Sequence, residues 1–291
     1  MREALFKRLV KLKKKLAGKG LERVPGVLAL SRLAHRVLVP KRIMPVHVNG
    51  LTLWVDPRDT TGVAPPLLQY GEYEPFITSI FSRIVKKGMT VIDVGANIGY
   101  FSVLAAKLVG PAGKVYAFEP EPHNFALLSK NIAFNKFPNC IPVNKALSDK
   151  NGTTQLYLDA CNWGAHSLAA QNVDGKKAVR IQTVRLDDFL RNMRNVDVIK
   201  IDAQGAEGLI LKGMRDVIAK NKHLKIIMEF WPFALRNMGS EPRDILQFVR
   251  DAGFRISVLD DGKRKIIPVT DVTRLIQIQP DWATNLLLEK E

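Results

Sequence analysis

The chain has 291 residues, of which 46% are apolar, and a net charge of +16 at pH 7. This length can bury one substantial core with room for an extension, and the apolar fraction is ordinary for a globular protein. The sequence excludes a membrane-spanning helix because no stretch offers about 18 uninterrupted apolar residues, and Cys140 and Cys161 have neither metal-ligand nor disulfide-framework spacing, which indicates a reducing compartment.

The positive charge is concentrated at the N-terminus. Residues 1–45 contain 13 Lys and Arg against Glu3 and Glu22, a net charge of +11, whereas the rest of the chain is close to balance. Leucines recur at helical spacing from Leu5 to Leu16 among many lysines, which predicts a basic amphipathic helical arm. Such an arm can lie on an anionic membrane surface through residues 1–23, or pack as a solvated helix on its own apolar residues. We therefore expect a cytoplasmic protein that can also bind the inner face of a membrane.

Short strands and helices follow in alternation. Asn49-Gly50 predicts the turn of a hairpin between Val46 and Val55, and Pro65-Pro66 predicts a break before the next helix. The remaining pattern predicts helices at 74–85, 98–108, 122–135, 205–220 and 241–252, and strands at 90–94, 114–119, 141–145, 153–158, 178–184, 196–201, 224–230, 254–259 and 265–278.

The junction after residue 94 carries the clearest chemical signal. Val91, Ile92 and Val94 are typical of a parallel strand that is covered on both faces. Gly95 permits a sharp reversal and lets a ligand approach the backbone. Asn97 is predicted to cap a helix that begins near Ile98, where free N–H groups can meet a carboxylate or phosphate.

The next strand ends at Glu119, where a carboxylate can accept hydrogen bonds from both hydroxyls of a ribose. A dinucleotide-binding turn that starts at Gly95 would need glycine at position 97 and glycine or alanine at position 100. The chain has Asn97 and Tyr100 there, so the turn disfavours a nicotinamide or flavin cofactor.

Residues 91–100 resemble motif I of the S-adenosylmethionine-dependent class I methyltransferases, and more specifically the FkbM-type family. Four further segments support this resemblance in the right order: residues 71–75, 118–121, 186–190 and 199–207. The similarity extends from about residue 50 to about residue 260. One departure is Gln204, where many members of the family have an acidic residue.

The resemblance implies a Rossmann-like α/β fold over residues 46–291, with a seven-stranded, mostly parallel sheet and helices on both faces. The cofactor would be S-adenosyl-L-methionine, bound over the C-terminal strand ends. Asp93 would lie near the methionine amino group and Glu119 would hold the ribose. The other residues that the resemblance places at the cofactor are Gly95, Asn97 and Gly99 beside the methionine portion, Pro120, Ala146 and Leu147 beside the adenine, and Glu72 and Tyr73 above it.

Three candidate catalytic residues follow the predicted strands or lie in a polar loop. Asp202 is the first candidate to position or deprotonate the acceptor, and its alternative role is to position the cofactor or cap a helix. Glu229 could contact the acceptor or pair with a basic residue, and Glu207 suits the first turn of its helix. His166 could act as a base near neutral pH or be an exposed loop histidine. No spacing demands a metal ion, and we predict none.

The sequence thus predicts a methyltransferase that acts on a hydroxyl of a small-molecule or glycan acceptor, such as a sugar, a glycolipid or a secondary metabolite. An RNA methyltransferase that uses the arm to bind phosphates is one alternative. It is disfavoured because the arm has lysines but almost no aromatic residues for stacking. A non-catalytic adaptor that binds the cofactor is the other.

Overall fold

A computed structural model describes residues 5, 6, 8, 37–40, 42–175, 177–191, 195–276 and 283–290. The predicted basic arm therefore lies almost wholly outside the described residues. Within them, no helix is both long enough and apolar enough to cross a membrane.

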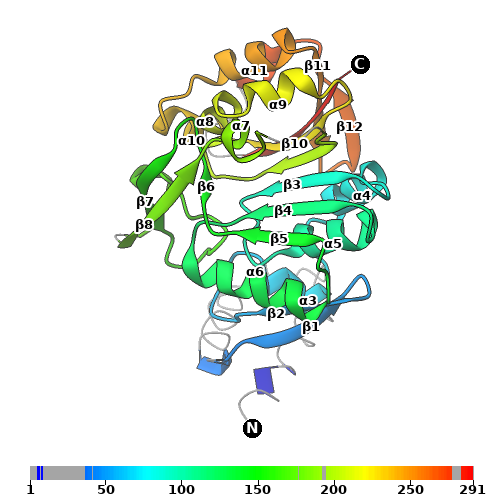
Figure 1. Cartoon of the computed structure of the whole chain (residues 1–291). Helices are drawn as coiled ribbons and strands as arrows, with labels where there is room; N and C mark the ends of the chain where they lie inside the picture. Colours follow the sequence, from blue (N-terminus) through cyan, green and yellow to red (C-terminus); the bar gives the residue numbers. More distant parts are fainter. Residues whose placement is uncertain are drawn as a thin grey trace.

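A sheet of eight strands forms the centre of the described part, in the order β12-β11-β13-β10-β9-β3-β4-β5 (Figure 1). The strands β5, β4, β3, β9 and β10 run parallel, and β13 lies antiparallel between β10 and β11. Their bounds are β3 (Thr90–Val94), β4 (Lys114–Phe118), β5 (Cys140–Val143), β9 (Val198–Ile201), β10 (Lys225–Phe230), β11 (Phe254–Asp260), β12 (Lys265–Pro268) and β13 (Thr284–Lys290).

The predicted count of seven strands is too low. The eighth strand is β12, which folds back on β11 as an antiparallel hairpin, from Ser257 opposite Pro268 to Asp260 opposite Lys265. The predicted strand over 265–278 stops at Pro268, and residues 272–276 form the helix α12 (Val272–Ile276). The strand β13 lies between β10 and β11, and the sequence pattern did not predict this strand.

Alternate residues of the parallel strands enter two different hydrophobic cores, because successive side chains of a strand point to opposite faces. Val91 belongs to the first core and Ile92 to the second. The helices of the first core are α3 (Ala64–Tyr70), α4 (Pro75–Ile84), α5 (Tyr100–Val109) and α6 (Pro122–Phe134). Those of the second are α7 (Leu186–Phe189), α8 (Glu207–Lys212), α9 (Arg215–Lys220), α10 (Pro232–Asn237), α11 (Pro242–Asp251) and α12. Helices thus cover both faces of the sheet, as predicted.

A hairpin of β1 (Met44–Val48) and β2 (Leu51–Val55) packs beside α6 (Figure 1). Its turn is Asn49-Gly50, and both residues have positive φ, as the sequence predicts. Asn131 of α6 and Asn135, the C-cap residue one turn later, form hydrogen bonds with the free edge of β2. Asn131 accepts from Trp54 N–H (2.6 Å) and donates to Trp54 C=O (3.1 Å), and Asn135 makes the same pair with Thr52.

A second sheet, in the order β6-β8-β7, consists of β6 (Ala146–Leu147), β8 (Lys177–Val184) and β7 (Gly152–Leu158). This confirms the predicted strands near 153–158 and 178–184. Tyr157 also pairs with Ser167, which fixes one end of the loop that the candidate site uses.

Two helix predictions need correction. Pro65 and Pro66 do not mark a break before a helix but lie in the first turn of α3 (Ala64–Tyr70). Proline is tolerated there because the first N–H groups of a helix have no partner within it. The predicted helix over 205–220 is two helices, since α8 ends at Lys212 and α9 begins at Arg215. At the junction, a Cβ added to Gly213 would lie 2.0 Å from the Ser148 carbonyl oxygen.

Candidate active site

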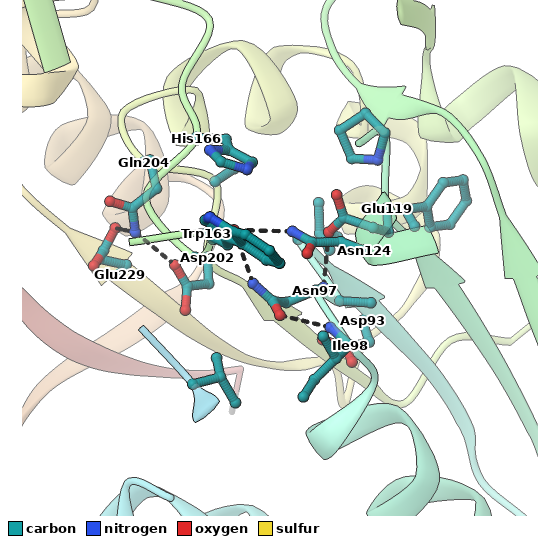
Figure 2. A pocket seen from close by; sticks show the side chains of 18 of the residues that line it. Asp93, Asn97, Ile98, Glu119, Asn124, Trp163, His166, Asp202, Gln204 and Glu229 are labelled. Carbon is teal, nitrogen blue, oxygen red and sulfur yellow. Dashed lines mark hydrogen bonds between the residues drawn. The ribbon is translucent and has the colours of Figure 1, made fainter. Parts of the chain in front are cut away.

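A cavity of about 470 Å³ lies at the carboxyl ends of β3 and β9. The cavity lies at the topological switch point of the sheet, because β4 and β5 lie on one side of β3 and the later strands lie on the other side. Open α/β sheets bind ligands at such points. Figure 2 shows the cavity, with the residues of motif I on one side and Asp202, Gln204 and Glu229 on the other.

The turn between β3 and α5 is about two residues longer than predicted. The helix begins at Tyr100 with Gly99 as its N-cap, so Asn97 is not the cap. Asn97 instead has φ 51, and its Oδ1 accepts from Ile98 N–H (2.6 Å) while its Nδ2 donates to the Trp163 carbonyl oxygen (3.2 Å) (Figure 2). Asn tolerates this left-handed conformation better than most residues.

Two glycines of the turn lie close to other parts of the protein. A Cβ on Gly95 would lie 1.8 Å from the Asp202 carbonyl oxygen, so Gly95 lets β3 and β9 approach each other where they end. A Cβ on Gly99 would lie 2.6 Å from Leu128 of α6. Gly95 lines the cavity, whereas Gly99 does not.

Glu119 lies directly after β4, with 5% of its surface exposed. Its Oε2 accepts from Asn97 N–H (2.7 Å) and its Oε1 from Glu121 N–H (2.8 Å). Burial raises the pKa of Glu119 to about 8, although the two N–H bonds act in the opposite direction. Each oxygen keeps a second lone pair that could accept from a hydroxyl in the cavity.

Asp93 is the last residue but one of β3 and is buried. Its Oδ2 accepts from the Ser102 hydroxyl (2.6 Å), and its Oδ1 is buried without a hydrogen-bond partner among the described residues. Burial raises the pKa of Asp93. A buried carboxylate oxygen without a partner is costly, and an ammonium group in the cavity would satisfy it.

The loop after β7 closes one wall of the cavity. The Trp163 carbonyl oxygen accepts from Asn97 Nδ2 and from Asn124 Nδ2 (2.9 Å), and Trp163 N–H donates to Asp59 Oδ1 (3.3 Å). Thr60 N–H and Thr61 N–H donate to the Cys161 carbonyl oxygen (3.0 and 3.2 Å). Segments that lie about 100 residues apart in the sequence are therefore tied together over the motif I turn.

Most residues predicted at the cofactor line this cavity: Tyr73, Asp93, Gly95, Asn97, Glu119, Pro120, Ala146 and Leu147. Glu72 does not, because its side chain is exposed outside the lining. Glu74, two residues further along, takes the place predicted for Glu72. It precedes α4 with φ 43, and burial raises its pKa to about 7.

Lys200 lies among several acidic side chains of the cavity. It is a strand residue with 4% exposure, its Nζ lies 3.1 Å from Asp202 Oδ2, and the same Nζ lies 4.6 Å from the centre of the Phe101 ring. Burial alone would lower its pKa, but Asp202, Glu74 and Asp93 together raise it, so Lys200 stays charged.

Gln204 joins two of the predicted catalytic acids. Its Nε2 donates to Asp202 Oδ1 and to Glu229 Oε2, both at 2.9 Å (Figure 2). Burial raises the pKa of Glu229 well above its usual value, and the charges of Asp202, Glu207 and Glu74 add to this shift. Glu207 itself accepts from Ala203 N–H and Gly205 N–H (2.9 and 3.0 Å), the turn-steadying role expected for it.

His166 also lines the cavity. Its Nδ1 accepts from Asp159 N–H (2.9 Å), so the neutral ring carries its hydrogen on Nε2. Burial lowers the pKa of His166 and favours this neutral form. Nε2 can thus donate a hydrogen bond, but it lacks the free lone pair that a base needs.

The sequence reasoning missed Lys200, Glu74, Asn124 and Trp163. Lys200 could have been found, because a lone charge inside the apolar run 198–201 is unusual in a strand buried on both faces. For Asn124 and Trp163 no signal existed, since their meeting depends on how the loop folds back. Among the described residues, no group of three or more His, Cys, Asp and Glu has the arrangement of a metal site.

The comparisons with known proteins agree with this geometry. The model of the methyltransferase FkbM domain matches residues 93–256. Methyltransferase sdnD of Sordaria araneosa is 29% identical over 57% of this chain and 74% of its own length. The 31-O-demethyl-FK506 methyltransferase FkbM of Streptomyces tacrolimicus is 30% identical over 45% of this chain and 62% of its own. The 2-O-methyltransferase NoeI of Sinorhizobium fredii is 26% identical over 50% and 65%. The chain thus spans less than two thirds of the last two relatives.

Among solved structures, M. jannaschii TYW2 in complex with AdoMet matches with a TM-score of 0.44 and 16% identity, over 86% of this chain and 85% of that one. The strand order and the cavity at its turning point are those of an open α/β sheet that binds a ligand at its switch point. The family model covers more than half of the sequence. The chain belongs to the FkbM methyltransferase family, and S-adenosylmethionine is its cofactor.

The residues of the cavity fit this cofactor. The unpartnered Asp93 Oδ1 suits its amino group, and the spare lone pairs of Glu119 suit its ribose hydroxyls. Pro120, Ala146 and Leu147 provide apolar lining near Glu119.

Proposed function

We propose that this protein methylates a hydroxyl group of a small-molecule or glycan acceptor, such as a sugar, a glycolipid or a secondary metabolite. The observation that carries the proposal is the acidic end of the cavity, where Asp202, Gln204 and Glu229 face the same space as the motif I residues. Two relatives carry an oxygen acceptor in their names, and this supports O-methylation.

The bound cofactor supplies an electrophilic methyl group with a good leaving group. The protein's task is therefore to align the acceptor hydroxyl and to take its proton. Asp202 is the proposed acceptor of that proton, because its carboxyl group lines the cavity beside Glu229 and lies 3.1 Å from Lys200 Nζ. Glu229 is proposed to hold the acceptor beside it, and His166 Nε2 to donate a hydrogen bond.

Cofactor binding is assigned to the other end of the cavity. Asp93 would hold the amino group, Glu119 the ribose and Pro120, Ala146 and Leu147 the adenine. Tyr73 and Glu74 come from the segment before α4 and would cover the cofactor from above.

A mass-spectrometric screen tests this function. The purified protein is incubated with S-adenosylmethionine and a library of glycans, glycolipids and secondary metabolites, and one acceptor should gain the mass of one methyl group in place of one hydrogen. Permethylation analysis of the product would identify the oxygen that was modified. Asp202→Asn should give at least about a hundredfold less product, and methylation on nitrogen or of RNA only would refute the assignment.

The net charge of +11 in residues 1–45 supports a second role for the arm. We propose that the chain consists of this arm and a methyltransferase domain over residues 46–291, and that residues 1–23 bind an anionic membrane surface. Deleting residues 1–23 should abolish sedimentation with vesicles that contain phosphatidylserine. A deletion variant that sediments as well as the full chain would exclude the arm as an anchor.

A further inference from the structure

The acidic end of the cavity contains more carboxyl groups than it can hold as anions. Asp202 and Glu229 line this end, Glu74 and Asp93 line the same cavity, and Lys200 is the cation among the four. Lys200 pairs with Asp202 at 3.1 Å, so this lysine balances the charge of one carboxylate. Isolated buried carboxylates that lack such a partner take up protons instead.

The side chain of Gln204 connects two of these carboxyl groups. One amide nitrogen donates to both Asp202 and Glu229 at 2.9 Å, so the two acceptor oxygens are held at fixed places on either side of it. The backbone of Gln204 is also tightly held. Its φ of 50 is unfavourable for a residue with a side chain, and its carbonyl oxygen accepts from Ser167 Oγ (2.8 Å) and Asn172 Nδ2 (3.0 Å).

The geometry points to a unit made of Asp202, Gln204 and Glu229 that carries one proton, releases it when a cation enters the cavity, and takes up the proton of the acceptor when that cation is consumed. In this unit Gln204 is a positioning residue. Asp202 and Glu229 are the groups that exchange the proton, and they do so next to the space that the acceptor would occupy.

The charges that surround Glu229 make it the carrier of the proton in the free protein. Asp202, Glu207 and Glu74 are the acids that face it, and Lys200 is the base. The structure pairs Lys200 with Asp202 and leaves Glu229 bonded to the uncharged amide. Burial and like charges thus raise the pKa of Glu229 well above its usual value.

The reaction makes this exchange useful. As the hydroxyl oxygen bonds to the methyl carbon, the carbon–sulfur bond breaks, its electron pair goes to sulfur, and the positive charge disappears. The O–H bond of the acceptor breaks at the same time, and its proton goes to the unit. The proton affinity of the unit rises at the moment that a proton must be taken up, because the neighbouring cation has just been lost. This last step rests on the proposed O-methylation; the release of the first proton does not.

Isothermal titration calorimetry tests the release without any acceptor. S-adenosylmethionine carries one positive charge that S-adenosylhomocysteine lacks, and titrations at neutral pH in two buffers of different ionisation enthalpy count the protons released by each. S-adenosylmethionine should release up to about one proton more than S-adenosylhomocysteine. Protons lost from Glu119 or Asp93 through contacts that both ligands share cancel in this difference.

Variants then locate the proton. Glu229→Gln should remove the difference between the two ligands, and Glu74→Gln should only reduce it, because the charge of Glu74 is one of several that make Glu229 hold its proton. Should Glu229→Gln fail to fold, Asp202→Asn provides a second variant. It should reduce the difference, because a neighbouring charge that makes Glu229 hold its proton is lost. A difference that survives Glu229→Gln, or one that disappears in Glu74→Gln, would overturn the assignment.

Gln204→Leu tests the positioning role. Without the amide donor Glu229 should hold its proton more tightly, so the number released at neutral pH should fall, while the affinity for S-adenosylhomocysteine should change by less than about threefold. An unchanged proton count, or an affinity for S-adenosylhomocysteine that falls more than about tenfold, would show that Gln204 is structural only. None of these outcomes depends on whether the acceptor atom is oxygen or nitrogen, so a failure here is distinct from a failure of the proposed function.

Discussion

Glu119 shows how one side chain can serve the fold and the ligand together. Its two oxygens accept from Asn97 N–H in the motif I turn and from Glu121 N–H at the start of α6. It therefore joins the turn after β3 to the end of β4. The remaining lone pairs lie in the cavity, where the ribose is proposed to bind.

Replacing Glu119 by Ala should weaken the binding of S-adenosylmethionine at least about tenfold, because the hydrogen bonds to the ribose would be lost. Calorimetry would measure the affinity. Asp216→Asn, which removes an exposed acid of α9, serves as the control and should bind normally. An unchanged affinity in Glu119→Ala would refute the ribose assignment.

At this scale the sequence predicted the residues that end strands. Asp93, Glu119, Asp202 and Glu229 were identifiable because each lies at or next to the end of a predicted strand, and the ends of parallel strands meet at one edge of a sheet. Glu74 was missed in favour of Glu72. The two lie two residues apart, and only the unusual φ of Glu74 directs the chain so that its side chain enters the cavity.

Among the elements, the junction of β3 and α5 is the most constrained. Gly95 is close to the end of β9, and its backbone N–H donates to the Phe118 carbonyl oxygen of β4 (3.0 Å). Three strands of the sheet thus meet at this residue. The sequence predicted glycine here for a sharp reversal, which the φ of 73 confirms, and for the approach of a ligand. The crowding by the neighbouring strand is a further reason that the sequence did not show.

Gly95→Ala should therefore lower the free energy of unfolding by more than the strain of a left-handed backbone alone would lower it. Gly88 provides a matched control, because its φ of 81 resembles the 73 of Gly95 but a Cβ there would meet nothing within 4 Å. Gly88→Ala should lower the free energy of unfolding by about 1–2 kcal/mol, and Gly95→Ala by at least twice as much, since β9 must move. Urea unfolding would compare them, and equal losses would contradict the packing explanation.

For the whole molecule, the sequence predicted the parallel half of the sheet better than the antiparallel half. The strands β3, β4, β9 and β10 are apolar runs separated by helices, which is a strong pattern. The strand β13 follows residues 277–282, outside the described part, and it inserts between two earlier strands. No local pattern encodes that insertion, because it depends on contacts between distant parts of the chain.

The buried acids together predict a pH dependence of stability. The folded-state pKa values of Glu74 and Glu119 are about 7 and about 8, against an ordinary value of 4.5. In the unfolded chain these groups are already ionised above about pH 5, whereas the folded protein still holds their protons. The free energy of unfolding should therefore fall as the pH rises toward about 8.

Thermal unfolding of the ligand-free protein between about pH 6.5 and pH 8 would measure this fall. His166 has a lowered pKa and acts with the opposite sign at lower pH, so the window starts at its ordinary value of 6.5. Glu119→Gln should flatten the decline, because a group that resists ionisation has been removed. A decline as steep as that of the unmodified protein would mean that other groups cause it.

The two asparagines of α6 have a consequence for the surface of the molecule. Through them the outer side of β2 offers bonded rather than free peptide groups at Thr52 and Trp54. An unprotected strand border can recruit an extended segment of another chain and start aggregation. The two amide side chains occupy the hydrogen-bonding positions that a third strand would use. They protect this edge of β2 without adding a strand to the hairpin.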